Sequence, residues 1–489
     1  ADEIMCAEEV ADDGAEAEAE VILDQFGNVV PLFAAHHGAL NTSSTQTSGY
    51  GLGLQGAIDE DLFGHTNQLV VGGSIDLGET EFHSESGIGV LNLNRSVTAG
   101  PEPFENTAIF EFETDGVTPE GEVARGEIGP ARAVAENTYY GIYVSDTFDV
   151  TDNLAVTLAG RFNHADIKIT DELDSYFPRE VTLAGDHSFS RFNPAAGATY
   201  TFPQLRTTAF ASYAEANRAP SPAELTCAEP TAPCRLPNSF VADPDLEQVV
   251  ARTFEAGVRG NLPDDWLGAA TSLDWALSFF HSENSNDIIF VSAGPALGTG
   301  FFQNVDKTRR RGVEAGLGGN AGRARWFVNY SFIEATFESG FTVASPNHPR
   351  AVDGEIMIEA GDDIPGIPQH NFGLGVDVEV LDGLTVGTSV VAKSGVYLRG
   401  DEANLLERTD SYAVVNFRTS YRIAEWLEVF GRIENLFNTD YETFGVLGEA
   451  EGTDGAVPIY ELPGGVTDPR FLSPGQPFAA FIGMRIRLN

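Results

Sequence analysis

The sequence is poor in several features that would assign it to a familiar class of protein. It has three cysteines and four tryptophans in 489 residues. No run of about 20 apolar residues is present to form a membrane-spanning helix. Basic residues are also scarce, since 28 Lys and Arg stand against 73 Asp and Glu and give a formal net charge of −45. Because nucleic-acid binding needs Lys and Arg against phosphates, nucleic acid is not expected as a partner.

Glycine and aromatic residues, in contrast, are plentiful. The chain contains 52 Gly, 33 Phe and 13 Tyr, and its mean hydropathy is −0.12. This composition is typical of a β-rich protein with many turns. The length does not decide the number of domains, because a β-barrel can use a whole chain as one sheet. The acidic excess indicates a solvated acidic surface, with attraction of cationic ligands or divalent ions to the loops as the alternative.

The last segment of the chain, residues 474–489, has the pattern of a membrane-crossing strand and reads PGQPFAAFIGMRIRLN. Every second residue forms a wholly apolar row: Phe478, Ala480, Ile482, Met484, Ile486 and Leu488. The opposite row ends on Arg485 and Arg487, and period-two alternation places the two rows on opposite faces of a strand. A strand that crosses an outer membrane needs about 9–11 residues, apolar outside and polar inside. The segment therefore predicts the closing strand of a transmembrane β-barrel.

Fourteen further segments with strand character precede it. They span residues 49–60, 67–82, 138–150, 153–170, 187–202, 206–217, 250–260, 267–290, 301–318, 323–338, 370–380, 384–398, 411–422 and 426–442. Short turns alternate with long connections, which are residues 83–137, 171–186, 218–249, 291–300, 339–369, 399–410 and 443–475. Bacterial outer-membrane barrels sort their loops in this way, with short periplasmic turns and long extracellular loops. We predict an all-β, antiparallel transmembrane barrel with about 15 strands in residues 49–489.

Residues 1–48 differ from the rest, because they carry ten Asp and Glu and no Lys or Arg. Such a run is typical of a solvated segment. If Asn489 ends in the periplasm, fifteen strands place residues 1–48 outside the cell as an acidic extracellular loop segment. Bacterial barrels have even strand numbers, so we expect an odd number of preceding strands to be missing. Residues 1–20 also lack a basic and then apolar secretion signal, which predicts that the chain is processed or truncated.

Six motifs then follow one another in a recognisable order. Residues 215–225 read EANRAPSPAEL, 238–260 read NSFVADPDLEQVVARTFEAGVRG, 301–319 read FFQNVDKTRRRGVEAGLGG, 361–375 read GDDIPGIPQHNFGLG, 432–445 read RIENLFNTDYETFG, and the terminal strand is the sixth. In order and spacing, this set resembles the C-terminal two-thirds of the barrel of TonB-dependent outer-membrane receptors. Each motif alone is weakly specific, whereas the ordered set together with the loop alternation is strongly specific.

The resemblance implies a 22-strand barrel around a plug domain, of which this chain would supply the last fifteen strands without the plug. It implies a receptor in the bacterial outer membrane for TonB-dependent, energy-coupled uptake of a scarce nutrient, with a ferric siderophore or similar chelate as first candidate. The TonB complex would act through the missing plug region, so we expect no active uptake by this chain alone. A passive outer-membrane pore or an adhesin barrel is the alternative. No histidine stands in a catalytic motif, and neither enzyme activity nor a cofactor is expected.

Two cysteines, Cys227 and Cys234, frame the sequence CAEPTAPC in an external loop. Barrels mature in an oxidising compartment, so we predict a disulfide between them. A metal-binding pair is the alternative, but no further Cys or His supports it. Cys6 is left without a partner, and neither it nor His36 and His37 has a third ligand at a spacing that would indicate a metal site.

Candidate ligand-binding residues lie in the external loops. Phe301, Phe302, Tyr397 and Arg399 could stack on or pair with an anionic chelate, and packing at the barrel rim explains them equally well. At the end of the chain, the position after Asn489 would continue the outward row of the last strand. We therefore expect the native protein to continue there with a terminal aromatic residue at the membrane interface.

Overall fold

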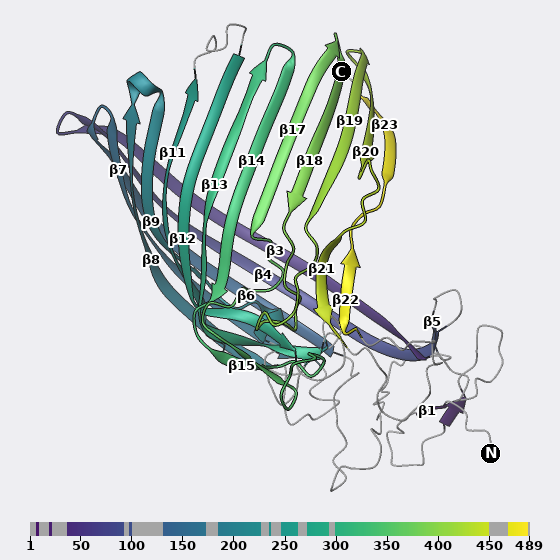
Figure 1. Ribbon diagram of the computed structural model, residues 1–489. Helices are drawn as coiled ribbons and strands as arrows, with labels where there is room; N and C mark the ends of the chain where they lie inside the picture. The colour runs from purple at the N-terminus through teal and green to yellow at the C-terminus, as the bar shows by residue number, and fades with distance from the viewer. Residues whose placement is uncertain are drawn as a thin grey trace.

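The computed structural model describes residues 37–91, 131–172, 184–225, 246–262, 271–292, 299–448 and 468–487, and the short strands β1 (Cys6–Glu8), β2 (Ala19–Val21), β5 (Val97–Ala99) and β10 (Cys234–Arg235). Within these residues, fifteen long antiparallel strands form one curved sheet (Figure 1). They are β3 (His37–Leu62), β4 (His65–Leu91), β6 (Ala131–Thr151), β7 (Leu154–Asp171), β8 (Gly185–Phe202), β9 (Thr207–Arg218), β11 (Val249–Leu262), β12 (Thr271–Ser292), β13 (Thr299–Ala321), β14 (Ala324–Phe337), β17 (His370–Leu381), β18 (Leu384–Lys393), β19 (Tyr412–Ala424), β20 (Leu427–Glu434) and β23 (Ala479–Ile486). Each of them pairs with the next one along the chain.

All fifteen predicted strands are confirmed, and the bounds differ mainly at the ends away from the short turns. Strand β3 begins at His37 rather than at residue 49, because its first part is polar and has no apolar row to reveal it. That part is held by pairing with β4, including a 3.2 Å hydrogen bond between the Thr47 and Thr80 hydroxyls. Strand β20 ends at Glu434 rather than at residue 442, because Asn435 and Asn438 adopt left-handed backbone angles, with φ of 47° and 49°.

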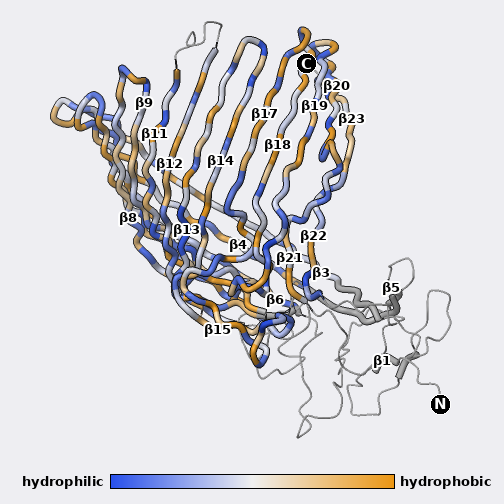
Figure 2. Tube along the Cα trace, in the orientation of Figure 1, coloured by the Kyte–Doolittle hydropathy of each residue, from blue (hydrophilic) through white to orange (hydrophobic). Residues whose placement is uncertain are grey.

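The outward face of the sheet is apolar. The registers place Leu54, Gly73, Ile142, Phe162 and Phe192 side by side on consecutive strands. On β23, the predicted apolar row is exposed on this face, with Ile482 at 85 % and Met484 at 68 % exposure. Figure 2 shows the resulting alternation of hydrophobic and hydrophilic positions along the strands. Such a row is costly in water and favourable in lipid, so this face is the membrane-contacting one. Among the described residues, no helix combines the length and apolarity needed to span a bilayer.

The inward face is mostly polar, and its aromatic exceptions have a packing reason. Phe327 interrupts the polar row of β14, and its ring lies where a side chain on Gly375 of β17 would be. Phe430 covers Gly483 of β23 in the same way. A glycine in a strand weakens the sheet, and a ring lying across it restores contact area. These inward aromatic rings therefore fill the space that the glycines leave on the inner face of the sheet.

The turns and the long connections lie at opposite ends of the sheet (Figure 1). The β3–β4 turn consists of Phe63 and Gly64, both with positive φ, which suits the twist of a two-residue hairpin. The other short turns in the described part of the chain share its end of the sheet. The opposite end carries α1 (Pro222–Leu225), the hairpin of β15 (Phe341–Ala344) and β16 (Glu355–Ile358), and the hairpin of β21 (Glu442–Leu447) and β22 (Arg470–Pro474).

Candidate functional site

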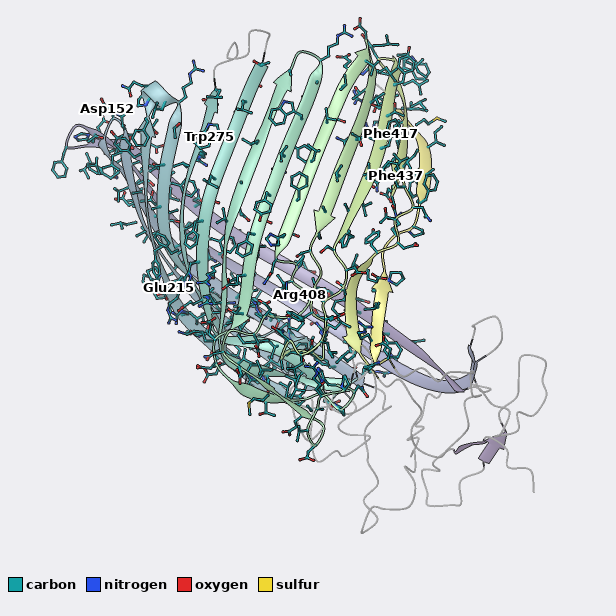
Figure 3. All side chains as sticks on the ribbon, viewed as in Figure 1. Asp152, Glu215, Trp275, Arg408, Phe417 and Phe437 are labelled. Carbon is teal, nitrogen blue, oxygen red and sulfur yellow. The ribbon has the colours of Figure 1, made fainter. Side chains whose placement is uncertain are left out.

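The long connections form a packed layer over one end of the sheet, and the predicted ligand-binding residues lie in it. We call this set of segments the loop layer. It comprises α1, the tip of the β12–β13 hairpin beyond residue 286, residues 338–369 with β15 and β16, residues 394–411, and β21 with β22. Figure 3 shows Arg408 among the side chains of this layer, at the end of the sheet opposite Asp152 in a short turn.

The pairing of β12 with β13 has a backbone irregularity at Asn286, near the tip of the hairpin. Asn286 has a φ of 54°, which interrupts the pairing between Ser285 and Asp287. The Asp287 carboxylate accepts hydrogen bonds from the Thr308 hydroxyl at 2.5 Å and from the Arg310 guanidinium at 3.1 Å, and Asp287 and Thr308 are both buried. This buried polar contact holds the irregularity in place, and beyond it residues 287–292 pair with residues 300–305.

The tip of this hairpin is packed on both of its faces. Phe302 joins a cluster that contains Ile167 and Ile169 of β7 and the fully buried Leu225 of α1. Phe301, the next residue along the strand, joins a second cluster that includes Phe337. Both predicted ligand residues are thus half-buried in apolar packing, which is the alternative that the sequence left open. Their ligand role stays a prediction.

Helix α1 is held in place by Glu224. Its carboxylate accepts hydrogen bonds from the backbone N–H of Ser221 at 2.7 Å and from the Ser221 hydroxyl at 2.9 Å. It also accepts one from the Arg218 guanidinium at 2.6 Å. Burial alone would raise the pKa of Glu224, but the hydrogen bonds from Arg218 and Ser221 lower it overall. The charged carboxylate therefore fixes the segment that inserts Leu225 into the first cluster.

Residues 338–369 and 394–411 are joined by a fully buried polar pair. His348 Nε2 lies 3.0 Å from Asp401 Oδ1, and neither side chain is exposed. The Asp401 carboxylate also accepts the backbone N–H groups of Leu405 at 2.7 Å and Leu406 at 3.0 Å. The backbone N–H of Arg350 donates to His348 Nδ1 at 3.0 Å, so Nε2 carries the proton that points at Asp401.

A second contact between the same two segments covers Tyr397. The Arg408 guanidinium pairs with Asp363 at 2.6 Å and donates to the Gln369 side chain at 3.0 Å. Its Cζ lies 4.5 Å from the centroid of the Tyr397 ring, which is a cation–π distance. One face of the predicted ligand residue Tyr397 is therefore occupied by Arg408.

Arg399 is the predicted residue best placed to meet a ligand. Its guanidinium carbon lies 5.8 Å from the ring centroids of both Phe290 and Phe444, and its side chain is exposed. Its backbone is fixed to β21, since its N–H donates to Gly445 at 3.0 Å and its carbonyl accepts from Leu447 at 2.8 Å. None of the ion pairs within the described part of the chain involves Arg399. The group is thus a positioned cation between two aromatic rings.

The structure brings two of the four predicted residues into one site. Phe290 links them, because its ring centroid lies 5.3 Å from that of Phe302 while Arg399 lies over its face. Sequence reasoning missed Phe290 and Phe444. Both stand in strands, and nothing local in the sequence indicates that these strands meet residues 394–411.

The inner wall near the short turns holds a second polar site. A cavity of about 960 Å³ is lined by side chains from β14, β17, β19, β20 and β23, including Arg325, Arg422 and Arg485. The Arg418 guanidinium donates two hydrogen bonds to the Asp377 carboxylate there, at 2.7 and 2.6 Å. This arrangement gives the inner wall a charged surface, in line with the polar interior predicted for the barrel.

The predicted disulfide cannot be placed, because Cys227 lies outside the described residues. Cys234 is in β10, whose backbone pairs with residues at the start of β13. The disulfide stays a prediction, and mass spectrometry of unreduced peptides checks it: linked peptides are expected, and two free thiols would contradict it. Within the described ranges, no group of three or more His, Cys, Asp or Glu side chains is arranged to hold a metal ion.

Comparison with protein families gives one match that spans most of the chain. Residues 25–436 match the family described as TonB dependent receptor-like, beta-barrel. Among curated proteins, the vitamin B12 transporter BtuB of Photobacterium profundum is 24 % identical over 209 residues, which are 42 % of this chain and 29 % of that protein. The probable TonB-dependent siderophore receptor PiuA of Acinetobacter baumannii is 24 % identical over 206 residues, 42 % of this chain and 25 % of that protein.

Solved structures show the same fold over nearly the whole chain. The siderophore receptor PiuA from Acinetobacter baumannii has a TM-score of 0.59 at 15 % identity and covers 92 % of this chain. The ferric citrate transporter FecA in its unliganded form has a TM-score of 0.55 at 15 % identity and covers 91 %. The copper transporter OprC has a TM-score of 0.56 at 14 % identity and covers 91 %. This chain spans 56, 55 and 57 % of those three chains, and identities this low support likeness of fold alone.

Proposed function

Because the chain belongs to the TonB-dependent receptor β-barrel family, we propose that it is part of a receptor for energy-coupled uptake of a scarce nutrient. Members of this family are bacterial outer-membrane proteins rather than enzymes, and this chain is an outer-membrane protein. The chain spans about half the length of the solved structures that it matches. The division into an acidic extracellular segment, residues 1–48, and a barrel portion, residues 49–489, is part of the proposal, with β3 reaching back to His37.

The proposed ligand is an anionic metal chelate, with a ferric siderophore as the first candidate. Its proposed partners are the TonB complex, acting through a plug region of the receptor, and the lipid of the outer membrane. The relatives include a siderophore receptor and transporters of ferric citrate, vitamin B12 and copper, so the family alone leaves the ligand open. The choice of an anionic chelate rests on Arg399.

The observation that carries this choice is the Arg399 guanidinium between Phe290 and Phe444. A guanidinium offers paired N–H donors that match a carboxylate or a pair of phenolate oxygens. The flanking rings hold the guanidinium in position while its exposed N–H groups remain open to a ligand, and a hydrogen bond from a charged donor is stronger than a neutral one. Planar parts of the same ligand would stack on the rings.

Uptake of radiolabelled ferric chelates by cells that express the complete receptor gene tests the proposal. Arg399→Ala is expected to reduce uptake at limiting chelate by about tenfold or more, since hydrogen bonds to a charged group contribute roughly 1.5–3 kcal/mol. Arg350→Ala is the matched control, because Arg350 is an exposed arginine of the same layer. This control is expected to leave uptake unchanged.

The energy dependence of uptake distinguishes a TonB-dependent receptor from a passive outer-membrane pore. A protonophore is expected to abolish uptake by the wild-type receptor. Uptake that continues in de-energised cells would instead indicate a passive pore. Equal uptake by the Arg399→Ala and Arg350→Ala variants would contradict the assignment of the ligand site but not that of the receptor.

A further inference from the structure

The cavity on the inner wall, at the end of the sheet that carries the short turns, is lined by many arginines. Its volume is about 960 Å³, and six arginines and three carboxylates line it. The strands that contribute them, β14, β17, β19, β20 and β23, lie with β18 in one continuous part of the sheet (Figure 1). The chain as a whole has 28 basic and 73 acidic residues, so basic side chains are concentrated at this cavity.

Four of the six arginines are already paired with carboxylates. The pairs are Arg323 with Asp382, Arg418 with Asp377, Arg432 with Glu434, and Arg485 with Glu428. The pair of Arg418 and Asp377 crosses Gly387, where a side chain would collide with atoms of both partners. The charges of these four guanidiniums are compensated within the sheet, so the four arginines form the frame of the cavity.

The other two arginines of the cavity, Arg325 and Arg422, have no such partner. Neither guanidinium takes part in an ion pair or a hydrogen bond with any residue that the structure describes, and both residues are exposed. The remaining carboxylate of the lining, that of Glu379, accepts the backbone N–H of Gly383 at 3.0 Å. Two guanidiniums therefore present their N–H groups to the interior, and each matches the paired oxygens of a carboxylate.

The floor of the cavity carries two hydroxyl side chains. Thr385 of β18 and Ser420 of β19 are direct partners in the register, and both line the cavity. Within the described ranges, neither side-chain hydroxyl is engaged in a hydrogen bond. Hydroxyl groups donate to carboxylate oxygens as guanidiniums do, and they carry no charge of their own. The cavity thus combines two unpaired cations with two further donors.

The spacing of the donors favours a ligand with several anionic groups. Three strand-to-strand steps of about 4.8 Å separate β14 from β19, which places Arg325 and Arg422 on different sides of the cavity. A ligand with two or more carboxylate or phenolate groups can contact both guanidiniums, whereas a monovalent anion leaves one of them unpaired. Small-molecule sites have volumes of about 300–1,000 Å³, and this cavity is at the upper end of that range.

We propose that Arg325, Arg422, Thr385 and Ser420 form a second binding site, for a small polyvalent anion, on the inner wall. The inference rests on the proposed function, because an anionic chelate that is taken up leaves Arg399 and moves toward the other end of the sheet. The inner-wall site receives the chelate there. A positively charged site away from the loop layer attracts the anion and so opposes its return to Arg399.

Isothermal titration calorimetry of the purified full chain in detergent, with the tricarboxylate citrate as the probe, tests the proposal. The parent protein carries Arg399→Ala, so that the loop layer does not contribute to binding. Adding Arg325→Gln and Arg422→Gln is expected to weaken citrate binding by at least about tenfold, because both groups donate charge-assisted hydrogen bonds. The matched control adds Arg252→Gln and Lys307→Gln, two half-exposed basic residues outside the cavity, and is expected to bind citrate as the parent does.

Competition by acetate distinguishes a polyvalent site from a general attraction of anions. Acetate is expected to displace citrate only at concentrations at least about tenfold above those of citrate, because it pairs with one guanidinium at a time. Displacement at similar concentrations would overturn the ligand class. If the double arginine variant does not fold, Ser420→Ala serves, since it removes a donor and no charge. It is expected to weaken citrate binding by about threefold, and unchanged binding would count against the proposal.

The remaining outcomes separate this site from the one at Arg399. No citrate binding by the Arg399→Ala parent, or equal binding by the double arginine variant and the control, would overturn the inner-wall site and leave the proposed function as it stands. Equal citrate binding by the wild type and the Arg399→Ala parent would instead contradict the ligand role of Arg399. In that case the inner-wall site is supported if the double arginine variant binds citrate more weakly than the parent does.

Discussion

The fifteen long strands, here called the strand wall, and the loop layer place their large apolar side chains in opposite environments. In the strand wall, Leu54, Ile142 and Ile482 point away from the protein and are among its most exposed residues. In the loop layer, Val343 is 4 % exposed and Ile358 is fully buried. The wall has lipid as its solvent and is held by backbone pairing between neighbouring strands. The loop layer stands in water and has to build an apolar core of its own, as a soluble domain does.

The two parts of the chain are therefore stabilised in different ways, the strand wall by backbone pairing within lipid and the loop layer by an apolar core. A change that damages the loop core should open the loop layer and leave the barrel in the membrane. A change on the outward row should impair insertion and leave the layer's packing intact. The following four substitutions test that separation.

The largest effect is expected from Phe337→Ala, at the end of β14 where this strand meets the core of the loop layer. The Phe337 ring is packed edge-on against Phe341, with centroids 5.3 Å apart, inside the second cluster. Removing a buried phenylalanine costs about 3–5 kcal/mol. Limited proteolysis is expected to cleave residues 338–369 in the variant, while the barrel keeps its resistance to unfolding in SDS without heating. Loss of that resistance would show that wall and layer do not unfold independently.

The opposite effect is expected from Ile482→Arg on β23. Ile482 faces lipid, and an arginine at the bilayer midplane costs about 2–4 kcal/mol. The protein is refolded into lipid vesicles and its folded fraction is measured as a function of urea concentration. The free energy of unfolding from these curves should fall by that amount. Phe481→Arg is the matched control, because Phe481 is the adjacent residue and faces the polar interior. Equal losses in the two variants would contradict the assignment of the faces.

A smaller effect is expected from Asp401→Asn, which tests the polar connection inside the loop layer. The amide can accept fewer hydrogen bonds than the carboxylate and leaves part of the His348, Leu405 and Leu406 donors unpaired. An unpaired buried donor costs about 1–3 kcal/mol. Proteolysis of residues 394–411 is expected to accelerate by about tenfold, whereas Asp410→Asn, at an exposed position of the same segment, should have no effect.

The smallest effect is expected from Glu402→Gln and appears as a change in pH dependence. Burial raises the pKa of Glu402, so the folded layer favours the protonated side chain. The stabilising contribution is fully present below the ordinary pKa of a glutamate and is lost as the pH rises through the raised value. Wild-type proteolysis in the loop layer should therefore accelerate as the pH rises above about 4.3. The glutamine variant should show a flatter profile, and identical profiles would argue against a raised pKa.

The strand wall was largely predictable, and particular residues show where prediction stopped. The apolar row of Ile482 and Met484 is visible in the sequence and lies on the exposed face. The placement of Phe327 on the inward face broke the pattern for a reason outside its own strand, since its ring covers Gly375 of a neighbour. The early start of β3 at His37 was missed, because polar residues in a ladder carry no periodic signal.

The candidate site was predictable only in part. Arg399 and Phe302 were identified from their residue types and their place in external loops, whereas Phe290 and Phe444 were not. The site includes Phe290, which lies beyond the irregularity at Asn286 and contacts Arg399 of residues 394–411. No local pattern in the sequence indicates an irregularity that depends on a hydrogen bond from Thr308 of the next strand to Asp287.

The sequence by itself determined the strands, their two faces and the sorting of short turns from long connections. These follow from the period of two in an extended backbone, which a stretch of about ten residues reveals where apolar and polar side chains alternate. Only the tertiary structure decided which loop residues meet. The pair of His348 and Asp401, and the rings around Arg399, join segments more than 40 residues apart. Such contacts depend on how neighbouring strands place their loops, and that placement is a property of the whole sheet rather than of any one segment.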